Sequence, residues 1–203
     1  MSLAPREPLV LASGSATRAR LLADAGLPIL VDPAAVDEEE IRASFQAEGR
    51  DAAACAAALA EAKAQRVSAR HTGALVLGAD QILECGGRWL EKPRDIEGAR
   101  AQLILMRGKD HTLITAAAIV RNGTLLWHTT DRARLTMRRF SDGFLDDYVA
   151  GGGDALLDSV GAYQLEGLGA QLFERVEGDF FTILGLPLLP LLDFLRGHGA
   201  LEA

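Results

Sequence analysis

The chain has 203 residues, of which 49% are hydrophobic and 24% charged, and its formal net charge at pH 7 is -7. This composition is typical of a globular protein that can bury a full core, as one large domain or as two tightly joined lobes. The acidic balance argues against a nucleic-acid or anionic-membrane surface, because such a surface requires a basic stripe. The net charge is compatible with an anionic small substrate, provided that the positive charges that bind it are gathered locally.

Cysteine and histidine residues form no metal-binding pattern. Cys55 and Cys85 are the only cysteines, and they lack the spacing of ligand pairs. The histidines are scattered as His71, His111, His128 and His198. No positively charged start followed by an apolar stretch marks a signal peptide, and the apolar stretch 180–192 is too short and too interrupted to span a bilayer. We therefore expect a cytoplasmic protein with ordinary buried thiols.

Hydrophobic periodicity and turn signals predict alternating strands and helices. In the first half of the chain we expect a strand at 8–12, a helix at 16–25, a strand at 29–31, a helix at 52–70, strands at 74–83 and 88–91, and a helix at 95–106. In the second half we expect strands at 111–121 and 125–137, a helix at 141–150, strand-like pieces at 162–165, 171–176 and 181–184, and a helix at 188–196. The pattern predicts an α/β fold: a mixed twisted sheet with flanking helices. We expect one domain over residues 1–203, with two lobes around a central cleft as the alternative arrangement.

Two charged residues occupy positions that are predicted to be buried. Lys63 falls on the apolar stripe of its helix, together with Leu59 and Val67. Asp80 lies inside the apolar run 75–83, which is typical of a buried strand. Because an unpaired buried carboxylate costs several kcal/mol, Asp80 requires a counter-ion, hydrogen bonds or a metal. The two charges predict either an enclosed polar site or a structural salt bridge, and Lys63 alternatively reaches solvent at the helix edge.

The turn 13–15, between a strand and a helix, is a candidate anion site. Backbone N–H groups at a helix start attract anions, and the hydroxyls of Ser13 and Ser15 add donors. Arg18 lies one turn into the helix, and helical side chains lean toward the N-terminus, so its guanidinium can reach the loop. The simpler interpretation is that Ser15 only caps the helix. The glycines and lysine of a Walker loop or dinucleotide fingerprint are missing.

The register of the hairpin at Gly86-Gly87 decides whether Lys92 can share a face with Asp80. If these glycines form a two-residue loop, Lys92 opposes Gln81 and faces away from Asp80. If residues 86–88 form a three-residue bulged loop, Lys92 shares the face of Asp80. A common site for the two charges therefore requires the bulged register, and the sequence leaves both registers open.

Two further segments carry acidic residues that could serve a site. The run 37–40 is most simply a solvated acidic loop, although one of its glutamates could reach a metal or Lys63. In the glycine-rich segment 161–169, the glycines would let a ligand approach closely, and Glu166 points from a loop or strand edge. A plain turn is the simpler interpretation of that segment.

Taken together, these segments resemble the Maf family of nucleoside triphosphate pyrophosphatases. The family's opening Ser-x-Ser-Pro-Arg-Arg loop, its acidic motif, its Glu-x-Lys-Ala helix, its Gly-Ala/Ser-Asp strand and its Gly/Glu-Lys-Pro turn are similar, in this order, to residues 11–18, 36–38, 61–64, 78–81 and 91–95. Residues 161–163, 166–167, 176–178 and 185–188 complete the series. The match covers nearly the whole chain in order, which makes it specific although each motif is weak alone.

The resemblance implies metal-dependent hydrolysis of a nucleoside triphosphate to the monophosphate and pyrophosphate, with Mg or Mn, in the house-cleaning of non-standard nucleotides. It also implies a homodimer. The implied site residues are Asp80 as general base, Lys63 and Lys92 as catalytic cations on the phosphates, Ser13, Ser15, Arg18, Gln81 and Glu166 as substrate-binding residues, and Glu38 with Asp80 as metal ligands. Glu166 would in addition help to bind metal or to order water. Such chemistry needs cations on the spreading negative charge and a carboxylate that aligns water.

Two positions depart from the family's pattern. The family's Pro-Arg pair is Ala16-Thr17 here, so that Arg18 alone remains of two arginines, and Ser159 replaces a frequent lysine. These departures favour a rival hypothesis, a nucleotide-sensing, division-linked binding protein with weak turnover. Substrate cues are mixed as well. Segments 80–81, 166–169 and 172–175 resemble the branch that acts on 7-methyl-GTP, whereas 90–95 and 161–163 resemble the branch that acts on dTTP and UTP.

Overall fold

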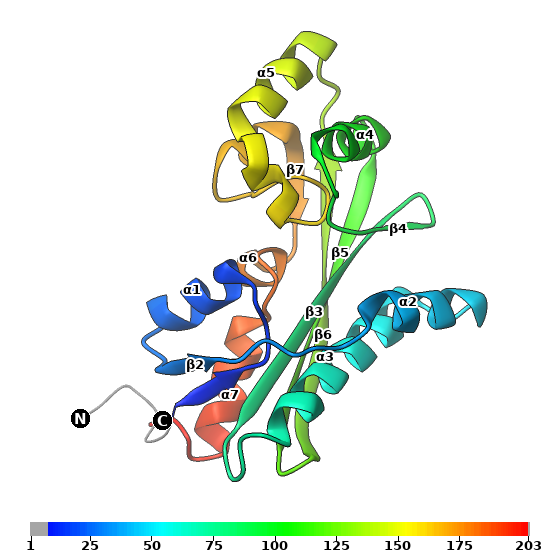
Figure 1. The fold of residues 1–203 in the computed structure, drawn as a ribbon. Coiled ribbons are helices and arrows are strands. Elements are labelled where there is room, and N and C mark those ends of the chain that lie inside the picture. Colours follow the sequence, from blue (N-terminus) through cyan, green and yellow to red (C-terminus); the bar gives the residue numbers. More distant parts are fainter. Residues whose placement is uncertain (1–7, 203) are drawn as a thin grey trace. The chain divides into compact units, whose positions relative to one another are not determined.

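The computed structural model describes residues 8–202, and its strands form one seven-stranded mixed sheet (Figure 1). The strand order is β2-β1-β3-β5-β6-β7, and β4 pairs with β3 outside this path. The strands are β1 (Leu9–Leu11), β2 (Ile29–Val31), β3 (Val76–Cys85), β4 (Arg88–Leu90), β5 (Asp110–Arg121), β6 (Thr124–Met137) and β7 (Phe173–Glu177). Strand β1 pairs in parallel with β2 and β3, whereas β3 with β4 and β6 with β7 are antiparallel. The expected mixed α/β class is confirmed.

Helices flank the sheet, and most of them begin at a residue whose side chain caps the first turn. The helices are α1 (Ala16–Asp24), α2 (Glu38–Ala47), α3 (Ala52–Ser68), α4 (Ile96–Met106), α5 (Asp142–Gly152), α6 (Phe180–Ile183) and α7 (Leu188–Gly197), with 3-10 turns η1 (Gly153–Asp158) and η2 (Leu168–Leu172). The capping residues, each accepting a hydrogen bond from a first-turn N–H group, are Ser15, Asp37, Asp51, Asp95 and Ser141. Each cap satisfies a donor that has no partner within its helix.

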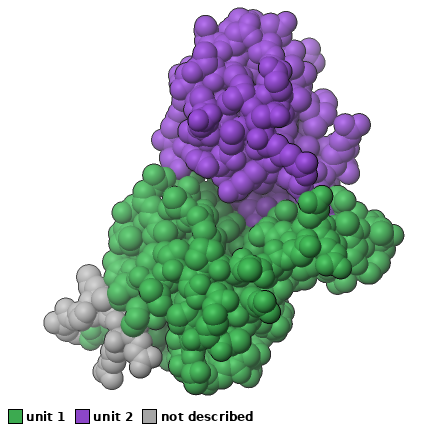
Figure 2. Space-filling view, in the orientation of Figure 1, with its two compact units in different colours: residues 1–80, 115–131, 180–203 green, residues 81–114, 132–179 purple. Residues whose placement is uncertain are grey.

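The chain divides into two compact units (Figure 2). Unit 1 comprises residues 1–80, 115–131 and 180–203, and unit 2 comprises residues 81–114 and 132–179. Strands β3, β5 and β6 each contribute residues to both units. In the described part of the chain, no helix is both long enough and apolar enough to cross a membrane.

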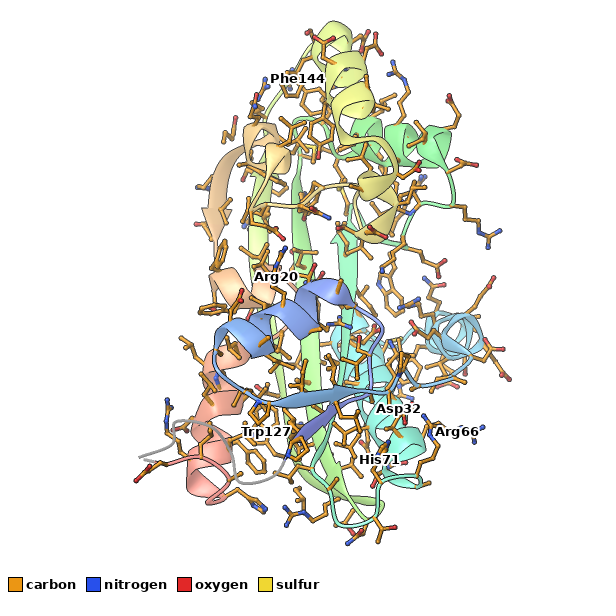
Figure 3. All side chains as sticks on the ribbon, turned by 60° about the vertical axis from the view of Figure 1, so that its left-hand side comes forward. Arg20, Asp32, Arg66, His71, Trp127 and Phe144 are labelled. Carbon is orange, nitrogen blue, oxygen red and sulfur yellow. The ribbon has the colours of Figure 1, made fainter. Side chains whose placement is uncertain are left out.

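The core of unit 1 joins the N-terminal strands to the C-terminal helix. One cluster is lined by aliphatic side chains of β1, α1, β3, β5 and α7, including Leu11, Leu22, Leu77, Ile119 and Leu191. At its border the rings of Trp127 and Phe194 stack, with centroids 5.4 Å apart (Figure 3). Trp127 therefore packs against the core of unit 1.

Helix α3 packs directly against strand β3 at Gly78. A Cβ atom at this position would lie 2.0 Å from the backbone oxygen of Ala60 and 2.8 Å from the backbone nitrogen of Ala64. Only glycine permits this separation, because real Cβ atoms do not approach backbone atoms so closely. The close packing brings Lys63 of α3 near Asp80 of β3.

Unit 2 has a small buried aromatic cluster around His111. Its imidazole Nε2 lies 2.8 Å from the hydroxyl of Tyr163, whose ring packs edge-on against Phe173 with centroids 4.8 Å apart. Burial lowers the pKa of His111 to about 4, against the charge of Asp110, which acts to raise it. The Nδ1 atom of His111 has no hydrogen-bond partner. A neutral imidazole is therefore the form that this cluster stabilises.

Both thiols are buried. Cys55, on α3, belongs to unit 1 and Cys85, at the end of β3, belongs to unit 2. Burial, together with the charge of Asp80, raises the pKa of the Cys55 thiol to about 11, and burial also raises the pKa of Cys85. Both are thus poor nucleophiles in the folded protein, as expected of ordinary buried cysteines.

Three expectations about local structure are wrong. The acidic run 37–40 is not a loop: Asp37 caps α2, and the three glutamates form its first turn, where negative charge favours the helix dipole. Residues 162–165 form no strand, since Ala162 has a φ of 58°, which an extended chain does not allow. The piece 181–184 lies largely in the helix α6 rather than in a strand. Asn122 and Gly123 form the turn between β5 and β6, with positive φ at both residues.

Candidate active site

The loop after β1 places Ser13 and Arg18 together at the start of α1. The Nη1 atom of Arg18 donates to the Ser13 hydroxyl at 3.1 Å and to the carbonyl oxygen of Ala79 at 2.9 Å, and its Nε donates to the carbonyl oxygen of Gly185 at 2.7 Å. Ser15 accepts a hydrogen bond from the Arg18 backbone N–H at 3.3 Å and so caps the helix. The guanidinium is thereby fixed beside the helix N-terminus, as the strand–turn–helix pattern predicted.

The carbonyl that holds Arg18 comes from the C-terminal part of the chain. Gly185 has a φ of +103°, and a Cβ there would lie 3.4 Å from the Nε of Arg18. A residue other than glycine would be strained in this conformation and would crowd the guanidinium. The segment 185–188 that contributed to the sequence resemblance therefore has a structural role: it orients Arg18.

Lys63 and Asp80 form a buried ion pair. The Nζ atom of Lys63 lies 2.6 Å from Oδ1 of Asp80, and the two residues are only 7% and 3% exposed. The same Nζ lies 2.8 Å from Oε1 of Glu38, at the start of α2. The structure thus confirms the burial that the sequence predicted for both charges. It also shows which of the acidic residues reaches Lys63.

Arg42 completes the cluster, and the sequence analysis missed it. Its Nη2 lies 3.1 Å from Oε2 of Glu38 and 3.3 Å from Oδ2 of Asp80. Lys63 and Arg42 therefore each bridge the two carboxylates. Arg42 follows Glu38 by four residues on α2, one helical turn on the same face. Recognition of a helix after Asp37 would have identified Arg42, whereas an acidic loop gave no reason to single it out.

The electrostatics of the cluster favour charged side chains. Partial burial acts to raise the pKa of Glu38, but the contacts with Lys63 and the charge of Arg42 outweigh it and hold the pKa below its usual value. Burial lowers the pKa of the Arg18 guanidinium, and the charges of Asp80 and Glu38 oppose this shift. Arginine stays protonated in proteins at such positions. The cluster thus presents fixed positive charge together with the ionised carboxylate of Glu38.

Two carboxylates are the only metal-ligand candidates in this cluster. No group of three or more histidine, cysteine, aspartate or glutamate side chains with metal-site geometry occurs among residues 8–202. Magnesium, however, is commonly bound by one or two carboxylates plus the phosphates of a substrate, and keeps several waters. Glu38 and Asp80 face the same two cationic groups, so their oxygens converge on one place. This donor set fits a metal that is shared with a substrate.

The remaining candidate residues belong to unit 2. Gln81 is half-buried, whereas Lys92 and Glu166 are exposed. The hairpin has the two-residue Gly86-Gly87 loop, since Leu83 pairs with Leu90 and Cys85 with Arg88. The bulged register, which the sequence analysis required for a shared face, is therefore not the one formed. Strand β4 ends at Leu90, so strand alternation does not fix the direction of Lys92.

A second charged cluster of unit 1 is more open to solvent. Asp32 accepts hydrogen bonds from both Nε and Nη2 of Arg70, at 3.2 and 2.8 Å, and its Oδ2 lies 2.8 Å from Nε2 of His71 (Figure 3). These hydrogen bonds lower the pKa of Asp32. The cluster ties the end of β2 to the end of α3, which is a structural role.

Comparison with known proteins agrees with the sequence resemblance. The family model of the Maf-like proteins matches residues 8–198. A nucleoside triphosphate pyrophosphatase of Paramagnetospirillum magneticum is 60% identical over 192 residues, which is 95% of this chain and 99% of that protein. One of Granulibacter bethesdensis is 51% identical over 193 residues, 95% and 98% of the two chains. A 7-methyl-GTP pyrophosphatase of Mesorhizobium japonicum is 50% identical over 196 residues, 97% and 98% of the two chains. The chain belongs to the family of Maf-like proteins.

Proposed function

We propose that this protein hydrolyses nucleoside triphosphates between the α- and β-phosphates and releases a nucleoside monophosphate and pyrophosphate. The observation that carries the proposal is the buried Lys63–Asp80 pair, which Glu38 and Arg42 extend into a cluster of two cations and two carboxylates. Cleavage of a phosphoanhydride requires cations for the charge of the phosphates and a carboxylate for the water. The names of the relatives support the same reaction class.

The residues of unit 1 would divide this work between binding and proton transfer. The Ser13 hydroxyl, the N-terminus of α1 and the Arg18 guanidinium would hold phosphate oxygens, because helix N–H groups and a fixed cation attract anions. Lys63 would neutralise charge that spreads onto the phosphates during bond cleavage. Asp80 would align a water molecule and accept its proton as the water attacks phosphorus.

A divalent cation, Mg²⁺ or Mn²⁺, would be held by Glu38 and Asp80. When bound, such an ion supplies positive charge to the phosphates and lowers the pKa of a water ligand. The two carboxylates would fix its position and share it with the triphosphate. Ser15 caps α1 and would keep the N–H groups of the helix N-terminus directed at the ligand.

The base of the preferred nucleotide is inferred from the relatives and from two segments of the sequence. Relatives named 7-methyl-GTP pyrophosphatase, such as those of Mesorhizobium japonicum and Rhizobium meliloti, are 50% and 48% identical to this chain. Segments 80–81 and 166–169 resemble that branch as well. We therefore favour a modified or non-standard nucleotide, removed in a house-cleaning role, over dTTP or UTP.

The product of the reaction tests the proposal. Purified protein would be incubated with Mg²⁺ or Mn²⁺ and a panel of triphosphates: 7-methyl-GTP, GTP, dTTP, UTP and ATP. We expect pyrophosphate and the monophosphate from at least one of them, quantified separately from orthophosphate. Release of orthophosphate alone would assign another phosphatase class. Tight binding with negligible turnover across the panel would instead support the nucleotide-sensing alternative.

A further inference from the structure

All four carboxylate oxygens of the cluster are already in contact with a cation. Lys63 contacts Oδ1 of Asp80 and Oε1 of Glu38, at 2.6 and 2.8 Å. Arg42 contacts the other two, Oδ2 of Asp80 and Oε2 of Glu38, at 3.3 and 3.1 Å. Lys63 and Arg42 thus alternate with the two carboxylates. A metal ion lies about 2.0–2.1 Å from its oxygen ligands, so its charge would repel a cationic nitrogen that lies beside the same oxygen.

The two cations differ in their freedom to withdraw. The side chain of Lys63 is 8% exposed, projects from the buried stripe of α3 and makes the shortest contact of the cluster. The side chain of Arg42 is 18% exposed, comes from the less buried helix α2 and makes the two longest contacts. An arginine side chain has several rotatable bonds, and its charged head tends toward solvent or an anion. Of these two cations, Arg42 is therefore the one that moves away from the carboxylates more easily.

We infer that Arg42 is the resident counter-ion of the metal-free protein, and that it occupies the place that a divalent cation takes between Glu38 and Asp80. The inference rests on the proposed function, because that function supplies the metal. Without the metal, Arg42 balances a carboxylate that would otherwise be buried with too little positive charge. Once a divalent cation is bound, Arg42 is repelled and its guanidinium can contact the phosphates of the substrate. Its departure also frees Oδ2 of Asp80 for water.

Metal binding in the absence of nucleotide tests this inference. The variants are Arg42→Met, which removes the charge but keeps most of the length, and Arg42→Lys, which keeps the charge but loses the planar fork. Arg66→Met is the matched control, since Arg66 is an exposed arginine of α3 (Figure 3). Free Mn²⁺ would be measured by electron paramagnetic resonance during titration of each protein. We expect Arg42→Met to bind Mn²⁺ about tenfold or more tightly than the wild type. Arg42→Lys should lie between the two, and Arg66→Met should match the wild type.

Thermal unfolding provides an independent readout. In EDTA, Arg42→Met should unfold at a lower temperature than the wild type, because the buried carboxylate of Asp80 and the half-buried one of Glu38 then share one lysine. Saturating Mn²⁺ should raise its midpoint by more than it raises that of the wild type. An Mn²⁺ affinity of Arg42→Met that is equal to or weaker than that of the wild type would overturn the inference, as would the absence of Mn²⁺ binding in every protein. If affinity responds as expected but no triphosphate is hydrolysed, the proposed function fails and the role of Arg42 stands.

Discussion

Asp80 and Lys63 show how a buried charge reveals itself in sequence and what it requires in structure. Both interrupt an apolar pattern, and both are buried in the folded protein. Ionised groups in the interior lose their hydration, and only close partners offset that loss. Here the partners are mutual: each carboxylate of the cluster meets two cations, and each cation meets two carboxylates.

The substitution Asp80→Asn keeps the size of the side chain and removes its charge. We expect turnover to fall by about 10²–10⁴-fold, because the attacking water loses its base. The fold should persist, since Lys63 retains its contact with Glu38 at 2.8 Å. Steady-state kinetics and circular dichroism would test both statements. The control is Asp193→Asn, on an exposed position of α7. Wild-type turnover by Asp80→Asn would exclude the assignment of this carboxylate as the base.

His111 predicts a pH dependence of stability. Its pKa is lowered to about 4 by burial, whereas the unfolded chain protonates it near 6.5. Between these values the unfolded state binds the proton and the folded state does not, so the free energy of unfolding falls as the pH falls from about 6.5 to about 4. The total loss is of the order of 3 kcal/mol. Below pH 4 both states are protonated and this contribution no longer changes.

Urea unfolding at a series of pH values would measure this effect. In His111→Phe, which keeps an aromatic ring beside Tyr163 and Phe173, the decline between pH 6.5 and 4.5 should be markedly shallower than in the wild type. His128→Gln, at an exposed position of β6, is the control and should retain the decline. Parallel curves for the wild type and His111→Phe would show that His111 does not cause the decline.

At the scale of elements, the site depends on how closely a helix approaches a strand. Helix α3 lies against β3 where Gly78 faces Ala60 and Ala64. Lys63 is next to Ala64 on α3, and Asp80 is two residues after Gly78 on β3. The separation of helix and strand therefore sets the length of the ion pair. Gly78, which has no side chain, therefore determines the distance between the charged groups of Lys63 and Asp80.

The substitution Gly78→Ala tests this dependence. The added Cβ meets backbone oxygen at 2.0 Å, so α3 has to move away from β3. We expect a loss of about 3 kcal/mol in the free energy of unfolding, together with lower turnover. Gly143→Ala is the matched control, because a Cβ at this exposed helical position meets nothing closer than 4.0 Å. That change should leave stability unaltered or raise it by up to about 1 kcal/mol. Equal stability of the two variants would show that Gly78 is not a spacer.

Some elements followed from the sequence and others did not, for physical reasons that differ. The capped helices α1, α4 and α5 and the Asn122-Gly123 hairpin follow from local chemistry, because side-chain caps and positive φ values act within a few residues. Helix α2 was missed because a run of glutamates is equally typical of a solvated loop. Because α2 was not expected, Arg42, which lies on it, was missed as well. The Gly86-Gly87 register was undecided because both closures use the same residues, and the pairing with β3 selects one.

The whole molecule is divided in a way that sequence patterns do not show. Three strands contribute residues to both compact units, so no linker, change of composition or glycine-rich stretch marks the division. The candidate cluster formed by Lys63, Asp80, Glu38 and Arg42 lies entirely within unit 1. Its members are far apart in the chain, and parallel pairing of β1 with β3 joins the loop of Ser13 to the strand of Asp80. Long-range pairing of this kind is what local patterns leave open.

The distribution of the two buried thiols gives each unit its own chemical reporter. Cys55 lies in unit 1 and Cys85 in unit 2, and neither is accessible in the folded protein. An alkylating reagent can therefore modify either thiol only after local or global opening. Peptide mass spectrometry would give the modification rate at each cysteine, and we expect rates about 10³-fold or more below those of the urea-unfolded chain. Equal protection at both positions would mean that the units open together. Unequal protection would rank the free energies of opening of the two units. No labelling site would have to be introduced, because both cysteines are native.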